Sequence, residues 1–381
     1  MFLQVHTLTS YHATLLNRDD AGLAKRIPFG GADRLRISSQ CLKRHWRQEL
    51  QRTLPLPSGI RSRQFFSRTV LEGLTESGVA EDLARKLVRA LVEKTIVGGF
   101  EDGDSLALKQ PVLFGRPEAD FFVSLLAECA AGGSEKAALE ALKEKLTTDK
   151  KNFRAMLQAA GHGNLFAGVE GALFGRFVTS DILARSDAAV HVAHAFTVHG
   201  LATEVDYFTV VDDLNREGET GAAHAGDMEL GAGIYYGYAA VDVPLLVSNF
   251  HGCPREQWRD TDSGDVPGVL TELVRTIATT SPGAKLGATA PYAYSDLVLL
   301  EAGPQQPRSL ANAYLDPLPM RGDTMQAAAQ RLARHLGELD TMYGRTAELR
   351  AVATTREWEG EPRPMPLPEA TKTALAAIFG G

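Results

Sequence analysis

The pattern of apolar residues changes twice along the chain, and this change limits the folds that the chain can adopt. From about residue 60 to residue 170, apolar residues recur at helical spacing among strong helix formers, as in "SGVAEDLARKLVRALVEKTI". Before and after this stretch, strand-like runs such as "MFLQVHTLTS" are mixed with helical ones. The sequence therefore predicts an α+β fold with an inserted helical lobe.

A long-looped β-hairpin is predicted in the second mixed part. "TEVDYFTVV" and "MELGAGIYYGYAAVDV" are strand-like runs on either side of a polar, glycine-containing segment. Further along, helical spacing covers residues 266–282 and 323–344, and an apolar run at 295–302 is typical of a strand.

Charge is distributed unevenly along the 381 residues, whose formal net charge is −7. Between Arg18 and Arg68 there are twelve Lys or Arg side chains and four acidic ones, a local surplus of eight positive charges. The rest of the chain therefore carries −15. A segment of this kind can attract a polyanion although the whole protein is acidic.

A helix is predicted to begin near Ser38, because Ser38 or Ser39 can cap it and "SSQCLKRHWRQELQ" follows. One stripe of this helix holds Leu42, Trp46, and Glu49 or Leu50, and its basic residues Lys43, Arg44 and Arg47 lie about one turn apart. The unpaired N–H groups of the first turn favour phosphate, and Gly30 and Gly31 allow the preceding loop a close approach. The other interpretation of this cluster is a solvated helix face with surface ion pairs.

Other candidate sites are weaker. Cys41, Cys129 and Cys253 are far apart and form no CxxC pair, and no familiar ligand set completes His191, His194 and His199. The acidic pairs at 19–20 and 212–213 are more typical of caps and turns than of a Mg²⁺ site. No nucleotide-binding or hydrolase motif is present. We expect no metal, no cofactor and no catalytic residue.

The chain has no apolar run of about 18 residues, and "MFLQVHTLTS" is not a basic then apolar leader. We expect neither a membrane span nor a signal peptide, and a cytoplasmic location.

Several motifs together resemble one known family. "LNRDD" is followed by "FGGADRLRISSQCLKRHWR", "GALFGRFVTSDIL", "VAHAFTVHG", "DYFTVVDDLNREGETGAAH", "TTSPGAKLGATAPYAYSDLVLLE" and "SLANAY". In this order they resemble the CasC-type backbone subunit of the subtype I-E CRISPR Cascade complex. Residues 60–165 and the C-terminal tail depart from the family pattern.

The resemblance implies a hand-like architecture. An RRM-like (ferredoxin-like) palm is expected in residues 1–60 and 171–345, with helical fingers in 61–170. The thumb is expected as a β-hairpin at 203–241, and residues 346–381 form a C-terminal segment.

The resemblance also implies a function without catalysis. About six copies polymerise along one guide crRNA and grip its phosphate backbone, whatever its sequence. One nucleotide in about every six is displaced, and the segments between are presented to the target DNA strand. The expected partners are the crRNA, further copies of the chain, and the large, small, crRNA-capping and crRNA-processing subunits, with no membrane. The implied RNA-binding residues are Arg18, Lys25, Arg36, Ser38, Gln40, Lys43, Arg44, Arg47, Arg176, Phe177 and Lys285, with Phe177 as an apolar wedge beside a kink.

Two alternatives stay open. Asp33, beside the glycines, occupies a suggestive place for the catalytic aspartate of a metal-dependent, RNA-cleaving backbone subunit of type III. The second alternative is an RRM-type RNA-binding protein that acts alone, although its usual aromatic signature is absent from the predicted strands.

Overall fold

The computed structural model describes residues 1–95, 99–101, 105–148, 165, 167–176, 186–210 and 224–380. The chain divides into two compact units, the first formed by residues 1–54, 191–242 and 267–381 and the second by residues 55–190 and 243–266. The second unit contains the segment predicted as fingers together with residues 171–190 and 243–266. A central antiparallel sheet with helices confirms the predicted α+β class.

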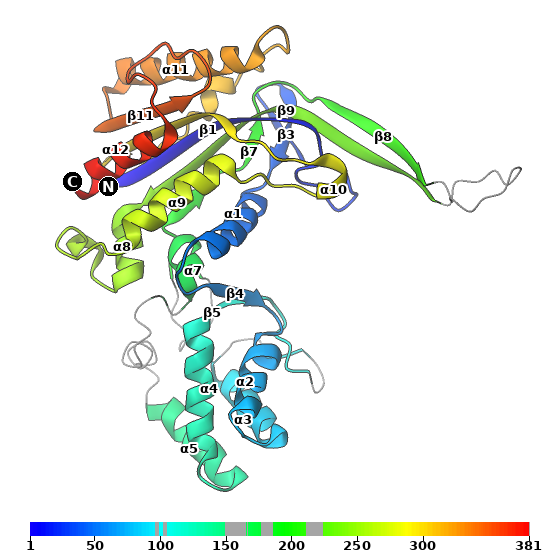
Figure 1. The fold of residues 1–381 in the computed structure, drawn as a ribbon, viewed down its shortest axis with the longest axis vertical. Coiled ribbons are helices and arrows are strands. Elements are labelled where there is room, and N and C mark those ends of the chain that lie inside the picture. The colour runs from blue at the N-terminus through cyan, green and yellow to red at the C-terminus, as the bar shows by residue number, and fades with distance from the viewer. Residues whose placement is uncertain are drawn as a thin grey trace, which may run out of the picture. The chain divides into compact units, whose positions relative to one another are not determined.

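The first unit is built on a sheet whose main path runs β11-β10-β1-β9-β7-β3-β2, with β6 and β8 also paired to β9 (Figure 1). Strand β1 is central because it pairs antiparallel with β9 on one side and β10 on the other. The strands are β1 (Phe2–Thr14), β2 (Arg26–Phe29), β3 (Ala32–Ile37), β6 (Val190–Val192), β7 (Ala195–Thr197), β8 (Thr203–Val210), β9 (His224–Asp242), β10 (Ser295–Gly303) and β11 (Leu349–Thr354).

Helices cover both faces of this sheet, which explains why β1 is buried along most of its length. On one face, Leu8 and Leu299 of the sheet pack with Tyr314 of η4 (Ala311–Tyr314) and Leu332 of α11 (Thr324–Tyr343). The other face carries α1 (Ser39–Thr53) and α9 (Val266–Thr279), and α12 (Leu367–Phe379) packs against β10 and β11. The C-terminal segment is therefore part of the first unit.

Strands β8 and β9 form the long hairpin expected around residues 203–241. They pair antiparallel from Thr203 opposite Gly231 to Val210 opposite His224. Beyond this hairpin, β9 continues along β1 and β7, so one strand of the hairpin is also a central strand of the sheet. The residues between the two strands lie outside the described part of the chain.

The second unit is mainly helical. Its elements are β4 (Gly59–Ser62), the π-helical turn η1 (Phe66–Leu71), α2 (Glu72–Glu76), α3 (Glu81–Thr95), β5 (Val112–Gly115), α4 (Arg116–Ala130), α5 (Glu135–Thr148), α7 (Gly168–Phe174), α8 (Val243–His251) and η3 (Arg255–Gln257). Leu87, Leu91, Phe114 and Phe122 belong to its buried core. Strands β4 and β5 pair with each other, away from the large sheet.

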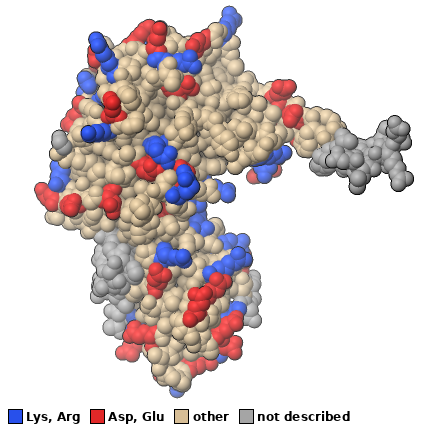
Figure 2. Space-filling model, in the orientation of Figure 1, with Lys and Arg blue, Asp and Glu red and all other residues tan. Residues whose placement is uncertain are grey.

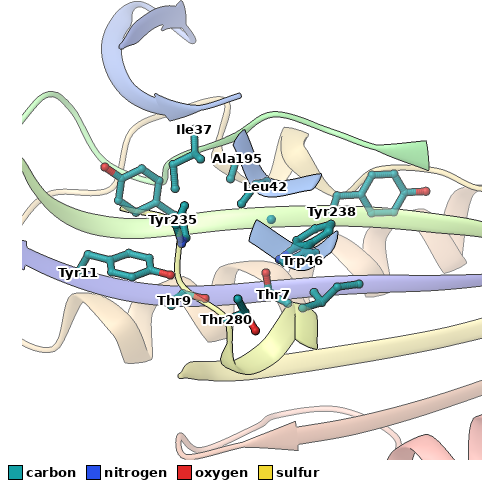
Figure 3. Close-up of a pocket in the computed structure, with 13 residues that line it drawn as sticks. Thr7, Thr9, Tyr11, Ile37, Leu42, Trp46, Ala195, Tyr235, Tyr238 and Thr280 are labelled. Atoms are coloured by element: carbon teal, nitrogen blue, oxygen red, sulfur yellow. The ribbon is translucent and has the colours of Figure 1, made fainter. Parts of the chain in front are cut away.

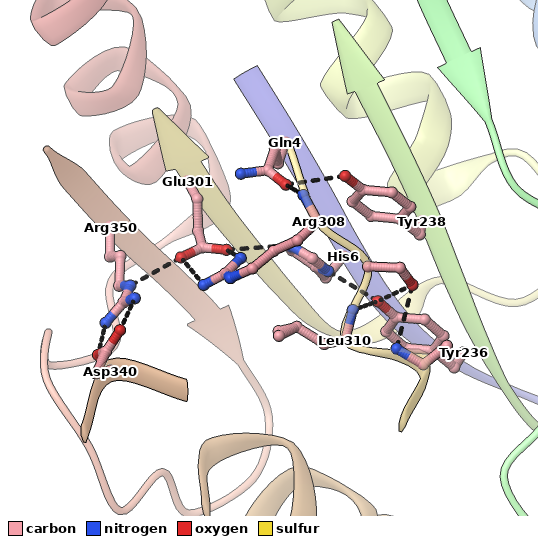
Figure 4. Close-up of polar contacts among 11 residues, drawn as sticks. Gln4, His6, Tyr236, Tyr238, Glu301, Arg308, Leu310, Asp340 and Arg350 are labelled. Carbon is pink, nitrogen blue, oxygen red and sulfur yellow. Dashed lines mark hydrogen bonds and ion pairs between the residues drawn. The ribbon is translucent and has the colours of Figure 1, made fainter. Parts of the chain in front are cut away.

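A buried polar network connects β1, β9, β10, β11 and α11 (Figure 4). At its centre the Glu301 carboxylate accepts hydrogen bonds from Arg308 at 2.6 and 3.0 Å and from Arg350 at 2.8 Å. His6 Nε2 lies 3.3 Å from the same carboxylate. Burial opposes the ionisation of Glu301, but His6 and Arg308 hold the pKa of its carboxyl well below the usual range. Because Arg308 and Arg350 both have acidic partners, this network has no surplus positive charge for an external anion.

In the part of the chain that the structure describes, no helix combines the length and the apolar character needed to cross a membrane.

Candidate nucleic-acid interface

The predicted helix at Ser38 is present, and its first turn is tightly capped. The Ser38 hydroxyl accepts a hydrogen bond from the Cys41 N–H at 3.2 Å, and the Ser38 N–H donates to Asn17 Oδ1 at 2.9 Å. Leu42, Trp46 and Leu50 form the buried stripe of α1. Ser38 is only 6% exposed, so its hydroxyl serves as a helix cap and is little available to a ligand.

Gly30 and Gly31 were expected in a loop that leads into α1, but the six residues of β3 separate them from the helix. They form the two-residue turn of the β2–β3 hairpin, with φ angles of +60° and +78°. Positive φ at both positions is the geometry of a tight hairpin turn and favours glycine. A Cβ atom on Gly30 would lie 1.4 Å from the Leu315 carbonyl oxygen, so the turn also needs glycine for close approach.

Arg34 is buried, although it belongs to the stretch from Arg18 to Arg68 in which positive charges are in surplus. The side chain is 0% exposed and donates hydrogen bonds to the carbonyl oxygens of Thr197 at 2.8 Å, Tyr314 at 3.1 Å and Leu315 at 3.3 Å. Burial lowers the pKa of this guanidinium. Arg34 therefore fastens the hairpin to the segment before α11 and contributes no exposed charge.

A group of cations surrounds the start of α1. We call it the basic cluster, and its members are Lys25, Arg36, Lys43 and Arg44. The Arg36 guanidinium donates to Nδ1 of His194 at 2.7 Å, and the Arg36 N–H donates to the Lys25 carbonyl oxygen at 2.8 Å. Partial burial, and then the charges of Arg36, Lys25 and Lys43, lower the pKa of His194.

Cys41 lies near two members of the basic cluster, Arg44 and Lys25. Burial raises the pKa of its thiol, while Arg44 and Lys25 act in the opposite direction. In the described chain no carboxylate pairs with Lys25, Arg36 or Arg44. The basic cluster is therefore a site of concentrated positive charge that can accept phosphate.

The other predicted residues near α1 differ in exposure. Arg18 is exposed and Gln40 is exposed in the first turn of α1, whereas Arg47 is partly buried. The Arg18 backbone is held by a bridge to Ala24, and the Asp19 carboxylate accepts from two backbone N–H groups of the same loop. Asp19 therefore acts as a turn residue, as expected from the sequence.

Lys285 lies on the loop between α9 and β10, at the N-terminus of the short helix α10 (Leu286–Thr289). Its ammonium group lies 5.2 Å from the centre of the Phe208 ring on β8. The loop is attached to the segment after β1 by a hydrogen bond from the Ala284 N–H to the Leu15 carbonyl oxygen at 3.1 Å. Lys285 is thus exposed, and it contacts the β8–β9 hairpin toward the end that lies away from the main sheet, where Phe208 is opposite Gly226.

Arg176 does not fit the predicted role. It lies in the second unit, is 2% exposed, and its guanidinium donates to both oxygens of Glu118 at 2.7 Å. A buried cation held by a buried carboxylate is a structural ion pair. Phe177, the predicted wedge, lies outside the described residues.

Several cations of the basic segment are neutralised or belong elsewhere. Arg26 pairs with the buried Glu229, and Arg52 pairs with Glu49, which also binds Arg275. Arg61, Arg63 and Arg68 belong to the second unit. On the face shown in Figure 2, Lys and Arg side chains are interspersed with Asp and Glu rather than covering it uniformly. The surplus of eight positive charges counted between Arg18 and Arg68 is therefore larger than the positive charge available at any one site.

A pocket between the sheet, α1 and α9 has a different chemistry (Figure 3). It is lined by Thr7, Thr9, Tyr11, Ile37, Leu42, Trp46, Ala195, Tyr235, Gly237, Tyr238, Ile277, Thr280 and Pro282. None of these side chains is charged, so the pocket lacks the cations that phosphate requires. Within the described ranges, no group of three or more His, Cys, Asp or Glu side chains is arranged to hold a metal ion.

His194 is the residue that sequence reasoning missed, since it was given only a structural role. It reaches the basic cluster because β3 pairs with β7, which sets Arg36 opposite Phe196. Nothing in the spacing of the histidines indicates this strand pairing.

A family model described as CT1975-like protein, of the Cas group, matches residues 3–375. The chain belongs to the CT1975-like protein family. This family membership agrees with the Cas proteins that the sequence motifs resemble. A comparison with curated protein sequences found no match.

Solved structures extend this result. A chain of a "CRISPR RNA-guided surveillance complex, pre-nicking" is 28% identical, with a TM-score of 0.80 over 100% of both chains. A chain of another "CRISPR RNA-guided surveillance complex" is 23% identical, with a TM-score of 0.59 over 100% of both chains, and bears on the fold alone.

Proposed function

We propose that this protein is the non-catalytic, crRNA-binding backbone subunit of a subtype I-E Cascade complex, of the CasC type. Its Cas family membership and its similarity to a chain of an RNA-guided surveillance complex support this role. The observation that carries the proposal is the basic cluster at the start of α1, where Arg36 is bonded through its backbone to Lys25 and through its guanidinium to His194, beside Lys43 and Arg44 of the helix. In this proposal the cluster holds the phosphate backbone of the guide.

Binding of this kind is independent of the guide sequence. Lysine and arginine groups bound to phosphates fix the position of a strand but read no base. The apolar residues of α1 are buried, and in this proposal exposed Arg44 and partly buried Lys43 on the other side of the helix face the ligand. Sequence recognition is then left to base pairing between the guide and the target DNA strand. Exposed Arg18, Gln40 and Lys285, with partly buried Arg47, extend the grip beyond the cluster in this proposal.

We further propose that about six copies line the guide and associate with the large, small, crRNA-capping and crRNA-processing subunits. The RRM-like palm grips the strand, and the β8–β9 hairpin acts as the thumb that displaces one nucleotide in about every six. Phe177 stacks beside the displaced nucleotide. Unstacking one step costs on the order of a few kcal/mol, and two charge-assisted phosphate contacts of roughly 1.5 to 3 kcal/mol each offset that cost.

The proposal includes no chemical step. Asp33, the candidate for a cleaving subunit, is exposed on β3 opposite Pro28. We expect the purified protein to leave target RNA intact with Mg²⁺ present. Cleavage at six-nucleotide intervals that Asp33→Ala abolishes would instead establish a type III activity.

Isolation of the protein with its bound nucleic acid tests the function directly. Sequencing of that material is expected to recover guide RNAs with varied spacers, held by several copies of the chain. Recovery of one short RNA motif by a monomer would indicate a separate RRM-type protein. A chain that carries no RNA at all would contradict both interpretations.

A further inference from the structure

Two tyrosines on the loop before β10 stand out by their exposure. Tyr292 and Tyr294 are each 75% exposed, more than any other large apolar side chain that the structure describes. For the described residues, neither hydroxyl has a hydrogen-bond partner and neither ring contacts another aromatic ring. No hydrogen bond and no aromatic contact among the described residues therefore explains why these two large rings are exposed to solvent.

The backbone between the two rings is held by hydrogen bonds to Ser281. Ala293 donates its N–H to Ser281 Oγ at 2.9 Å, and Ser281 Oγ donates to the Ala293 carbonyl oxygen at 3.0 Å. The Tyr11 hydroxyl reaches the same Ser281 Oγ at 3.3 Å. With Ala293 fixed at both its N–H and its C=O, the tyrosines on either side are displayed from a fixed base.

The residues before the tyrosines are equally constrained. Pro291 is buried and packs on Gly283, where a Cβ atom would lie 2.4 Å from the proline ring. On the other side, Thr9 and Ser295 hydroxyls are 2.8 Å apart. Little conformational entropy is then lost when a ligand contacts the two rings, because each tyrosine has only its two side-chain torsions left to fix.

The surroundings of the rings favour a nucleic acid. Lys285 lies on the same loop, and the loop is bonded at Ala284 to the segment that leads into exposed Arg18 (Figure 1). Leu286 on the same loop is 48% exposed, and the neighbours at 288, 290 and 293 are alanines, so Leu286 is the one other large apolar side chain exposed in the described segment 283–295. Aromatic rings beside cations are the combination that binds single strands.

We propose that Tyr292 and Tyr294 form a stacking platform for unpaired bases of a single-stranded nucleic acid. The inference rests on the proposed function, since the basic cluster brings the strand to this loop. Stacking on a ring is tolerant of sequence because every base has a π face. The platform adds to the phosphate grip without adding sequence preference.

RNA affinity of the full-length chain tests the platform. The probe is a fluorescent single-stranded RNA of mixed sequence, and the variants are Tyr292→Ala/Tyr294→Ala, Tyr292→Phe/Tyr294→Phe and the matched control Tyr343→Ala, whose side chain is 67% exposed at the end of α11. The alanine pair is expected to bind about tenfold more weakly, with an unchanged salt slope because no phosphate contact is lost. The phenylalanine pair and the control keep wild-type affinity.

Three results overturn the platform. The alanine pair binds RNA as tightly as wild type, or the phenylalanine pair loses as much RNA affinity as the alanine pair. The third is that the control Tyr343→Ala loses as much RNA affinity as the alanine pair. Lys43→Ala/Arg44→Ala separates this failure from failure of the proposed function. If that variant loses affinity and the tyrosine variants do not, only the platform is wrong. If the wild-type chain binds no RNA, the proposed function is wrong as well.

The source of the stacked bases is found with 2-aminopurine placed in either the guide RNA or the target DNA strand of the assembled complex. If the fluorescence of 2-aminopurine in one strand is quenched by the wild-type complex and recovers in the Tyr292→Ala/Tyr294→Ala complex, the platform is supported. The strand that carries this probe is then the one that stacks on the tyrosines. Absence of quenching on both strands overturns it. Loss of another protein subunit from the complex, with RNA affinity unchanged, would make the tyrosines a protein docking surface and also overturns it.

Discussion

The ammonium group of Lys285 lies 5.2 Å from the centre of the Phe208 ring. The two residues are far apart in the sequence, one on the loop after α9 and the other on β8. Phe208 in turn lies over Gly226 of β9, where a Cβ atom would approach the ring to 2.9 Å. The outer part of the β8–β9 hairpin is therefore in contact with a loop that also carries the two exposed tyrosines.

Phe208→Leu is expected to loosen the outer part of the β8–β9 hairpin, because a cation–π contact at an exposed site contributes about 0.5–1 kcal/mol. Amide hydrogen exchange in residues 203–210 should increase about two- to fivefold. Lys285→Met should produce a similar increase, and the double variant should add little. Tyr207→Leu is the matched control, since Tyr207 is a neighbouring exposed ring on the same strand. Equal effects of Tyr207→Leu and Phe208→Leu would contradict the contact.

Arg34→Ala is expected to destabilise the first unit by about 3 kcal/mol, because three buried carbonyl oxygens lose their donor. Arg34→Lys keeps the charge but not the planar fork, so it should recover only part of that loss. Urea unfolding measures both. The exposed Arg18→Ala serves as the control and should stay within about 0.5 kcal/mol of wild type. A stable Arg34→Ala variant would show that the hairpin does not depend on this side chain.

Arg34 and Arg36 also show where sequence reasoning reaches its limit. They lie two residues apart on β3 and so point to the same face of the strand. The segment at 314–315 accepts hydrogen bonds from the first of them, and this contact joins residues 280 positions or more apart. No local pattern distinguishes the buried arginine from the one that faces His194.

Local signals were more reliable. The cap at Ser38, the buried stripe of α1 and the strands of the β8–β9 hairpin are set by neighbouring residues, and the structure contains all of them. The β2–β3 hairpin was missed although its two-glycine turn is such a signal. Strand β11 and α12 were missed because their burial depends on β10, which lies far earlier in the chain.

RNA binding is expected to strengthen as the solution becomes more acidic. In the unbound protein, burial and the basic cluster hold the pKa of His194 below its ordinary value of 6.5. Bound phosphates screen the charges of the basic cluster and so raise the pKa of His194. The complex with RNA therefore binds the His194 proton more tightly than the unbound protein does. Between the two pKa values binding takes up a proton, and affinity rises as the pH falls. Each increase of one in the pKa corresponds to about tenfold tighter binding.

Titration of RNA affinity between pH 7.5 and pH 5 on the wild type and on His194→Gln measures this linkage. The variant should lose the pH dependence, whereas His191→Gln, a change at a nearby exposed histidine, should keep it. An identical pH profile for wild type and His194→Gln would place the phosphates away from the basic cluster.

The salt dependence of guide binding for Lys43→Ala/Arg44→Ala tests the central claim most directly. Binding of wild type and variant is measured at several salt concentrations, with two guides of unrelated spacer sequence. The basic cluster predicts weaker binding of both guides to the same extent, and a logarithmic salt slope shallower by about 1.4, since each phosphate contact on a single strand contributes about 0.7. An unchanged affinity and slope, or a loss confined to one guide, would contradict it.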